Sequence, residues 1–145
     1  MLKKTPHNAR ANNKAAEPAA TNAPIVARRL TESLSSAERK TYPLASGLLD
    51  YFPDALAAVS NVSWIGNEKH NPGEPLHHAR GKSMDHADCI IRHCMERGGF
   101  DVVVINGVEH RIRHTAALAW RALALLQEEL EQELSLPLPR NARFD

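Results

Sequence analysis

The sequence is poor in aromatic residues and in cysteine. Aromatic side chains make up 5% of the 145 residues, so a core must be built from Leu, Ala, Val and Ile, a mixture that favours helices. The two cysteines, Cys89 and Cys94, lie five positions apart in a segment with a helical pattern. They therefore point to different faces and cannot bridge each other, which is typical of a protein in a reducing compartment.

Long hydrophobic runs and an excess of one charge are also absent. No stretch reaches the roughly 18 apolar residues that a membrane-spanning helix needs, and the basic first residues are not followed by the apolar run of a signal peptide. We therefore expect a cytoplasmic protein that does not contact a membrane. The 18 basic and 17 acidic side chains give a net charge of +1, which does not support a general nucleic-acid binder.

The length fits one domain with tails and excludes a multidomain enzyme. Residues 1–29 are rich in Asn, Ala, Pro and Lys and are expected to form a disordered basic arm, with six basic residues and one acidic residue. The arm is either a solvated tail or a contact for an anionic partner such as nucleic acid. Residues 30–136 are expected to form the folded domain, and residues 137–145 a short C-terminal tail.

Four segments have helical patterning. They cover residues 30–40, 53–70, 83–97 and 109–134, while residues 101–105 read as a short strand or an extended loop. Pro53 and Asp54 suit the first turn of the second helix, and Ser83 is a plausible N-cap for the third. The expected fold class is all-α, a small bundle of three to four helices.

The fourth helix carries information beyond local structure. Between residues 116 and 126 every side chain except Arg121 is apolar, so this part is hydrophobic nearly all round and must be buried on several sides. Three other short helices can hardly enclose it. We therefore expect a homo-oligomer in which these helices pack across an interface.

Histidine is the unusual feature of the composition. Seven of the eight histidines lie between residues 70 and 114, a window that also contains acidic and basic side chains. Together these groups can bind a metal ion and a phosphorylated ligand.

Two aspartates and one glutamate are candidate metal ligands. Asp85 and Asp88 are spaced i,i+3 near the start of the third helix, so both carboxylates project from one face toward a hard divalent ion. Glu68 completes the set if the second and third helices pack antiparallel. In the alternative interpretation, Asp85 complements the helix dipole and Asp88 pairs with Arg92.

Other histidine pairs point to different sites. His110 and His114 are i,i+4 in the predicted fourth helix, a spacing that can hold zinc in a zinc-stabilised small domain, although the order is not that of a metalloprotease. His86 and His93 share a face of the third helix, where such a pair is more often packed than ligating.

The loop before the third helix is a candidate phosphate site. Arg80 and Lys82 lie just before a helix N-terminus, where backbone N–H groups and the helix dipole attract an anion. A P-loop is excluded, because its spaced glycines are missing. A surface loop with two solvated cations explains these residues equally well.

Four motifs resemble one known family. They are GNEKHN at residues 66–71, DHAD at 85–88, Arg92 followed by His93, and HTAALAW at 114–120. Taken together, over about residues 41–134, they resemble the dATP/dGTP diphosphohydrolase N-terminal domain family, found mostly in bacteriophages. The chain is also distantly similar to the all-α MazG-type pyrophosphohydrolases, but it offers three acidic residues where that pattern has four.

The resemblance implies hydrolysis of a purine deoxynucleoside triphosphate to monophosphate and pyrophosphate, which would adjust the nucleotide pool during phage infection. It also implies a Mg²⁺ or Mn²⁺ cofactor and a cytoplasmic location in the host. Under it, Glu68, Asp85 and Asp88 would hold the metal, and His93 or His114 would orient the attacking water or a phosphate oxygen. The substrate-binding residues would be Lys69, Asn71, His77, Arg80, Lys82 and Arg92. A different class of function is a non-catalytic phage protein, virion-associated or binding a partner, that keeps the helical scaffold.

Overall fold

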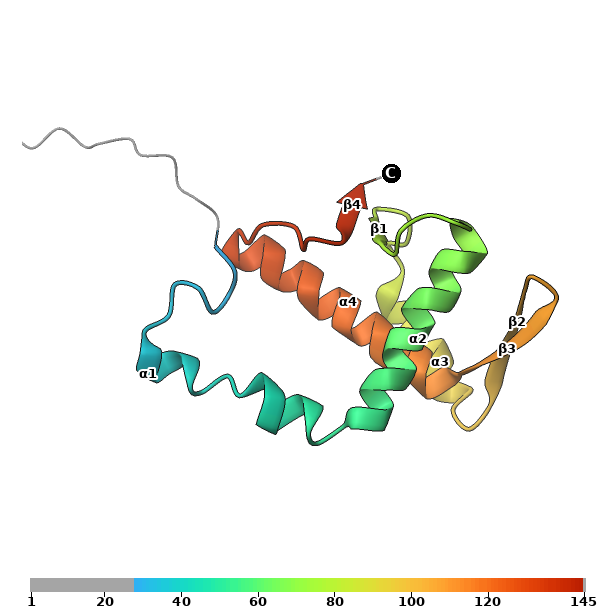
Figure 1. Cartoon of the computed structure of the whole chain (residues 1–145), viewed down its shortest axis with the longest axis horizontal. Coiled ribbons are helices and arrows are strands. Elements are labelled where there is room, and N and C mark those ends of the chain that lie inside the picture. The colour runs from blue at the N-terminus through green and yellow to red at the C-terminus, as the bar shows by residue number, and fades with distance from the viewer. Residues whose placement is uncertain (1–27, 145) are drawn as a thin grey trace, which may run out of the picture.

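The computed structural model describes residues 28–144 (Figure 1). The predicted arm therefore lies, except for Arg28 and Arg29, outside the described residues. The elements in chain order are α1 (Ser36–Arg39), η1 (Ala45–Leu49, a π-helical turn), α2 (Pro53–His70), β1 (His78–Arg80), α3 (His86–Met95), β2 (Phe100–Ile105), β3 (Val108–Arg113), α4 (His114–Leu134) and β4 (Ala142–Phe144). The described part of the chain is mostly helical but contains four strands, so the expectation of a purely all-α fold is wrong.

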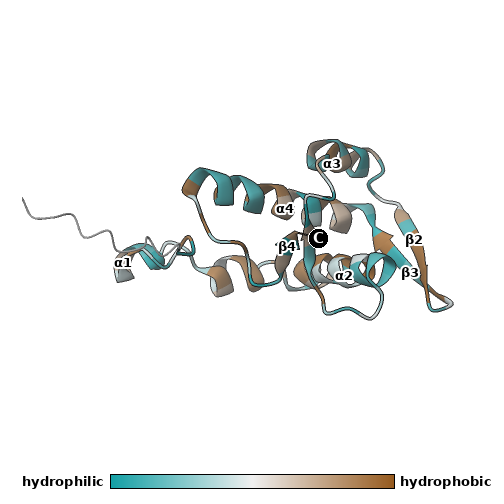
Figure 2. Ribbon diagram, turned by 90° about the horizontal axis from the view of Figure 1, so that it is seen from above, coloured by the Kyte–Doolittle hydropathy of each residue, from teal (hydrophilic) through white to brown (hydrophobic). Residues whose placement is uncertain are grey.

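The long helix α4 is the centre of the fold, and both α2 and α3 pack against it (Figures 1 and 2). Its buried residues are alanines, namely Ala116, Ala117 and Ala124. Small side chains let neighbouring helices approach closely, and Ile65 of α2, with 1% of its surface exposed, is the most deeply buried large side chain among the described residues. α2 begins at Pro53 and ends at His70, as the sequence predicts.

The β2–β3 hairpin replaces the predicted first turn and a half of the fourth helix. Asn106 and Gly107 form a two-residue turn with φ of 50° and 79°, the backbone conformation that an Asn-Gly hairpin turn requires. The antiparallel register places Asp101 opposite Ile112. His110 is consequently a strand residue, so it does not share a helix face with His114 and the predicted i,i+4 zinc pair does not exist.

The two ends of the described chain contact the folded body. The segment predicted as a C-terminal tail contains β4, which pairs in parallel with β1. Arg29 donates hydrogen bonds to the carbonyl oxygens of Pro137, at 2.7 Å, and Leu138, at 2.5 Å. Both contacts join segments that are far apart in sequence, which local patterning does not reveal.

The segment before α2 leaves the body of the domain as an arm-like extension (Figure 1). Of the predicted helix at residues 30–40, only α1 forms, started by a capping box between Ser35 and Glu38. Large hydrophobic side chains of this segment, such as Leu49 and Tyr51, are exposed. Within the described part of the chain, no helix combines the length and the apolar character that crossing a membrane requires.

Candidate functional site

One large cavity, of about 1110 Å³, lies among α2, α3, β2, α4 and the loop that carries β1. Its lining includes apolar residues, such as Ile65 and Ala117, and many polar side chains. Its basic and imidazole lining residues are Lys69, His70, His77, His78, Lys82, His86, Arg92, His93 and Arg121. An anionic ligand with an aromatic part is the chemistry that such a lining accommodates.

Most residues predicted to bind substrate line this cavity. They come from the end of α2, the loop that follows it and α3, and they are Lys69, Asn71, His77, Lys82 and Arg92. His93, predicted to be catalytic, also lines it. The structure therefore brings together residues spread over 25 positions of the sequence.

Arg80 is placed differently from this group. Only 6% of its surface is exposed, and its guanidinium donates two hydrogen bonds to the carboxylate of Glu131 at 3.0 and 2.9 Å. Glu128 lies 3.4 Å from the same guanidinium. These bonds join the β1 strand to the C-terminal half of α4, so the geometry favours a structural ion pair over a phosphate contact.

The three predicted metal carboxylates do not form one group. Asp85 is the N-cap residue of α3; it accepts a hydrogen bond from Ser83 at 2.7 Å and one from Cys89 Sγ at 3.4 Å. The hydrogen bond from Ser83 lowers the pKa of Asp85 below its ordinary value. Asp88 is exposed, and Glu68 lies on α2. Among the described residues these three carboxylates do not bring ligand atoms within 4.8 Å of one another, so this metal site stays a prediction.

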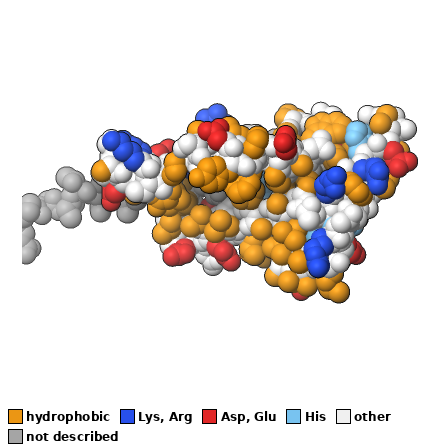
Figure 3. Space-filling model, turned by 90° about the horizontal axis from the view of Figure 1, so that it is seen from below, with side chains coloured by type: hydrophobic (Ala, Val, Ile, Leu, Met, Phe, Trp, Pro, Cys, Tyr) orange, Lys and Arg blue, Asp and Glu red, His pale blue; other side chains and the backbone are white. Residues whose placement is uncertain are grey.

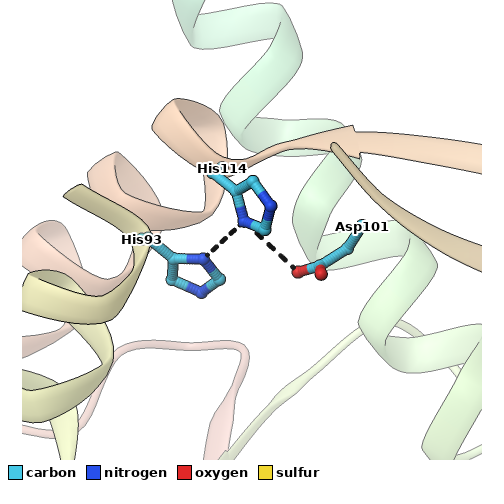
Figure 4. A group of neighbouring side chains, drawn as sticks. All are labelled: His93, Asp101 and His114. Carbon is cyan, nitrogen blue, oxygen red and sulfur yellow. Dashed lines mark hydrogen bonds and ion pairs between the residues drawn. The ribbon is translucent and has the colours of Figure 1, made fainter. Parts of the chain in front are cut away.

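A different cluster can hold a metal ion. His93 of α3, Asp101 of β2 and His114, the first residue of α4, point toward one another (Figure 4). The Nδ1 atoms of the two histidines are 3.1 Å apart, and Asp101 Oδ2 lies 3.7 Å from His114 Nδ1. Both histidines are buried, with 5% and 7% of their surface exposed. His93 and Asp101 also line the large cavity, so the cluster lies at its edge.

The surroundings of the cluster fix its histidines. Burial and the neighbouring positive charge of Arg92 lower the pKa of His93, which favours the neutral imidazole at neutral pH. A Cβ atom on Gly99 would lie 3.2 Å from the ring of His114, so glycine leaves the room that this ring occupies. Glu96 Oε2 lies 3.4 Å from His114 Nδ1 on the side of α3.

Sequence reasoning missed two residues of the site. Asp101 has no role predicted from the sequence, although the Asn106-Gly107 signal predicts a hairpin, and the register of that hairpin carries Asp101 to the start of α4. Asn67 is the second: its amide donates to the Glu74 carbonyl at 2.9 Å, while its buried Oδ1 accepts no hydrogen bond from the described residues. Asn67 also lines the cavity.

The comparisons with known proteins add no identity to this geometry. No protein-family model, curated protein or solved structure matches the chain.

Proposed function

We propose that this protein hydrolyses purine deoxynucleoside triphosphates to monophosphate and pyrophosphate within the large cavity, with the help of a divalent cation. The observation that carries the proposal is the convergence of Lys69, Asn71, His77, Lys82 and Arg92 on one cavity. The resemblance of the sequence motifs to the dATP/dGTP diphosphohydrolases predicts that each of them binds the substrate.

The charges of the cavity suit a triphosphate. Lys69, Lys82 and Arg92 are cationic and lie on three different segments, so they can neutralise separate phosphate groups. Arg121 of α4 adds a fourth cation, which already donates to Ser83 Oγ at 2.6 Å. Cations fixed around a polyphosphate stabilise the charge that develops on the leaving pyrophosphate.

The other lining residues suit a nucleobase. Trp120 and His78 form an edge-to-face pair with ring centroids 5.1 Å apart, and both line the cavity. Aromatic rings of this kind stack on bases. The buried Oδ1 of Asn67 can accept an N–H of the base, such as the exocyclic amino group of adenine or guanine.

Nucleotide hydrolysis tests the proposal directly. Purified full-length protein is incubated with each dNTP and NTP plus Mg²⁺ or Mn²⁺, and the products are separated by anion-exchange chromatography. We expect monophosphate and pyrophosphate from dATP or dGTP, and a loss of about tenfold or more in kcat/KM for Lys69→Ala and for Arg92→Ala.

A matched variant controls for charge. Arg97→Ala removes an exposed cation of the same region that does not line the cavity, so it should leave turnover unchanged. Release of intact triphosphate would contradict the proposed bond cleavage. An absence of turnover with every nucleotide would contradict the proposed hydrolysis and favour the alternative of a non-catalytic binding protein.

A further inference from the structure

We propose that His93, Asp101 and His114 form a binding site for a divalent transition-metal ion such as Zn²⁺, Co²⁺ or Mn²⁺, with the Glu96 carboxylate close to His114. The proposal departs from the predicted set Glu68, Asp85 and Asp88, whose carboxylates the described structure does not gather. It does not depend on nucleotide hydrolysis.

The distances within the cluster are those between ligands of one ion. Metal–nitrogen and metal–oxygen bonds of about 2.0 to 2.2 Å place tetrahedral ligand atoms about 3.4 Å apart. The atoms next to His114 Nδ1 are His93 Nδ1 at 3.1 Å, Glu96 Oε2 at 3.4 Å and Asp101 Oδ2 at 3.7 Å. Small adjustments of the half-exposed carboxylates equalise these separations.

Hydrogen bonding alone does not account for the arrangement. A ring nitrogen of histidine carries either one proton or one lone pair in the ring plane, so it makes one good hydrogen bond. Three polar atoms converge on the Nδ1 of His114, and two of them belong to carboxylates. The ligand atoms of His93, Asp101 and His114 all lie within 4.8 Å of one another, so a cation among them interacts favourably with all three at once.

The donor set decides the class of metal. Two imidazole nitrogens and a carboxylate suit Zn²⁺, Co²⁺ and Mn²⁺, whereas Mg²⁺ prefers oxygen ligands and retains its water.

The position of Arg92 beside His93 is unfavourable for metal binding. Its NH2 group lies 3.4 Å from Nε2 of His93, which must carry a proton when Nδ1 binds a metal. Two donors would then face each other, so the exposed Arg92 side chain has to move away. This competition predicts that removing Arg92 tightens metal binding, the opposite of what removing a ligand does.

The cluster opens toward the cavity through His93 and Asp101, which line it. A remaining coordination position is therefore available to water or to a phosphate oxygen. This last step rests on the proposed function.

Titration of metal-free protein with Co²⁺ tests the site, because a low-symmetry nitrogen and oxygen site gives visible Co²⁺ absorption. We expect one Co²⁺ per chain, displaced by Zn²⁺. Asp101→Asn and His93→Gln should weaken binding by about tenfold to hundredfold or more, and Arg92→Gln should strengthen it. Far-ultraviolet circular dichroism confirms that each variant is folded, and Asp101→Asn is the informative one because its side chain is half-exposed.

Matched controls use residues of the same types elsewhere. His110→Gln changes a histidine that packs on Trp64, and Asp50→Asn changes an exposed aspartate, so both should bind Co²⁺ like the native protein. Equal Co²⁺ binding by the native protein and Asp101→Asn, or no binding at all, would overturn the proposal.

The two proposals fail in distinguishable ways. If the protein binds Co²⁺ at this cluster but does not hydrolyse nucleotides, the proposed metal site stands and the proposed function fails. The opposite result is also possible. If the protein hydrolyses dATP or dGTP with Mg²⁺, its Asp101→Asn variant does so equally well, and no Co²⁺ site is found, then the proposed function stands and the proposed metal site fails.

Discussion

At the scale of single residues, this protein buries an unusual share of polar groups. Its buried polar side chains among the described residues are Asn67, Arg80, His86, His93 and His114. Buried polar groups are costly unless they are paired, so each is expected to serve either the fold or a ligand. Arg80 serves the fold through Glu131, whereas Asn67 and His93 line the large cavity and His114 contacts His93.

The Arg80 pair gives a stability prediction. Arg80→Ala leaves the carboxylate of Glu131 without its bidentate partner, which should lower the free energy of unfolding by about 3 kcal/mol. Urea unfolding followed by circular dichroism measures the loss. Arg97→Ala, at an exposed position, should change it by less than about 0.5 kcal/mol. Equal effects of the two substitutions would show that the Arg80 pair does not stabilise the fold.

Two histidines predict how stability depends on pH. The pKa of His93 and that of His78 are lowered from the ordinary histidine value of 6.5, in each case chiefly by burial and next by a neighbouring arginine. The unfolded chain therefore takes up protons as the pH falls through about 6.5, while the folded chain resists them. Their contribution to stability is present above that pH and is lost below it.

Thermal unfolding between pH 7.5 and pH 5.5, in the presence of a chelator, measures this effect. We expect Tm to fall with pH, and to fall less steeply in the double variant His78→Gln, His93→Gln. An unchanged slope in the double variant would assign the acid sensitivity to other groups.

At the scale of elements, the β2–β3 hairpin positions the acidic member of the metal cluster. Gly107→Ala places a side chain at a φ of +79° and should destabilise the protein by about 1 kcal/mol. Because β2 carries Asp101, we also expect weaker Co²⁺ binding. Gly66→Ala is the control, since Gly66 lies inside α2 with no atom near the added methyl group, and it should stabilise by about 0.5 to 1 kcal/mol. If Gly107→Ala changes neither the stability of the protein nor its Co²⁺ binding, the turn does not hold Asp101 in place.

At the scale of the whole molecule, one chain leaves much apolar surface uncovered. Figure 3 shows hydrophobic side chains over much of one face. On α4, Leu126 keeps 50% of its surface exposed although the helix is apolar nearly all round at that point, and Leu49 of η1 is also exposed. Large exposed apolar surface marks an interaction site, so we expect a homo-oligomer.

Sedimentation velocity tests this expectation. The native protein should sediment as a dimer or a larger species at micromolar concentration, and Leu126→Glu or Leu49→Glu should shift it toward the monomer. Met84→Glu changes another exposed apolar residue, in the loop before α3, and should leave the species unchanged. A native protein that sediments as a monomer would contradict the expectation.

Features that depend on neighbours along the chain can be predicted from the sequence. Pro53 and Asp54 start α2 where predicted, because proline fits the first helical turn and an acidic group suits the helix dipole. The region between residues 70 and 114, in which histidines and cations are crowded, supplies part of the lining of the cavity. Preferences that depend on neighbouring residues, such as those at this helix start, can be predicted without knowledge of the fold.

Features that depend on distant partners become visible only in the folded chain. The sequence of residues 109–113 favours an extension of α4, but their backbone groups pair with β2, so these residues form part of strand β3. That pairing places Asp101 beside His114, and packing of α3 on α4 adds His93. The physical reason is that strand pairing and helix packing gain free energy from groups that the local sequence does not contain.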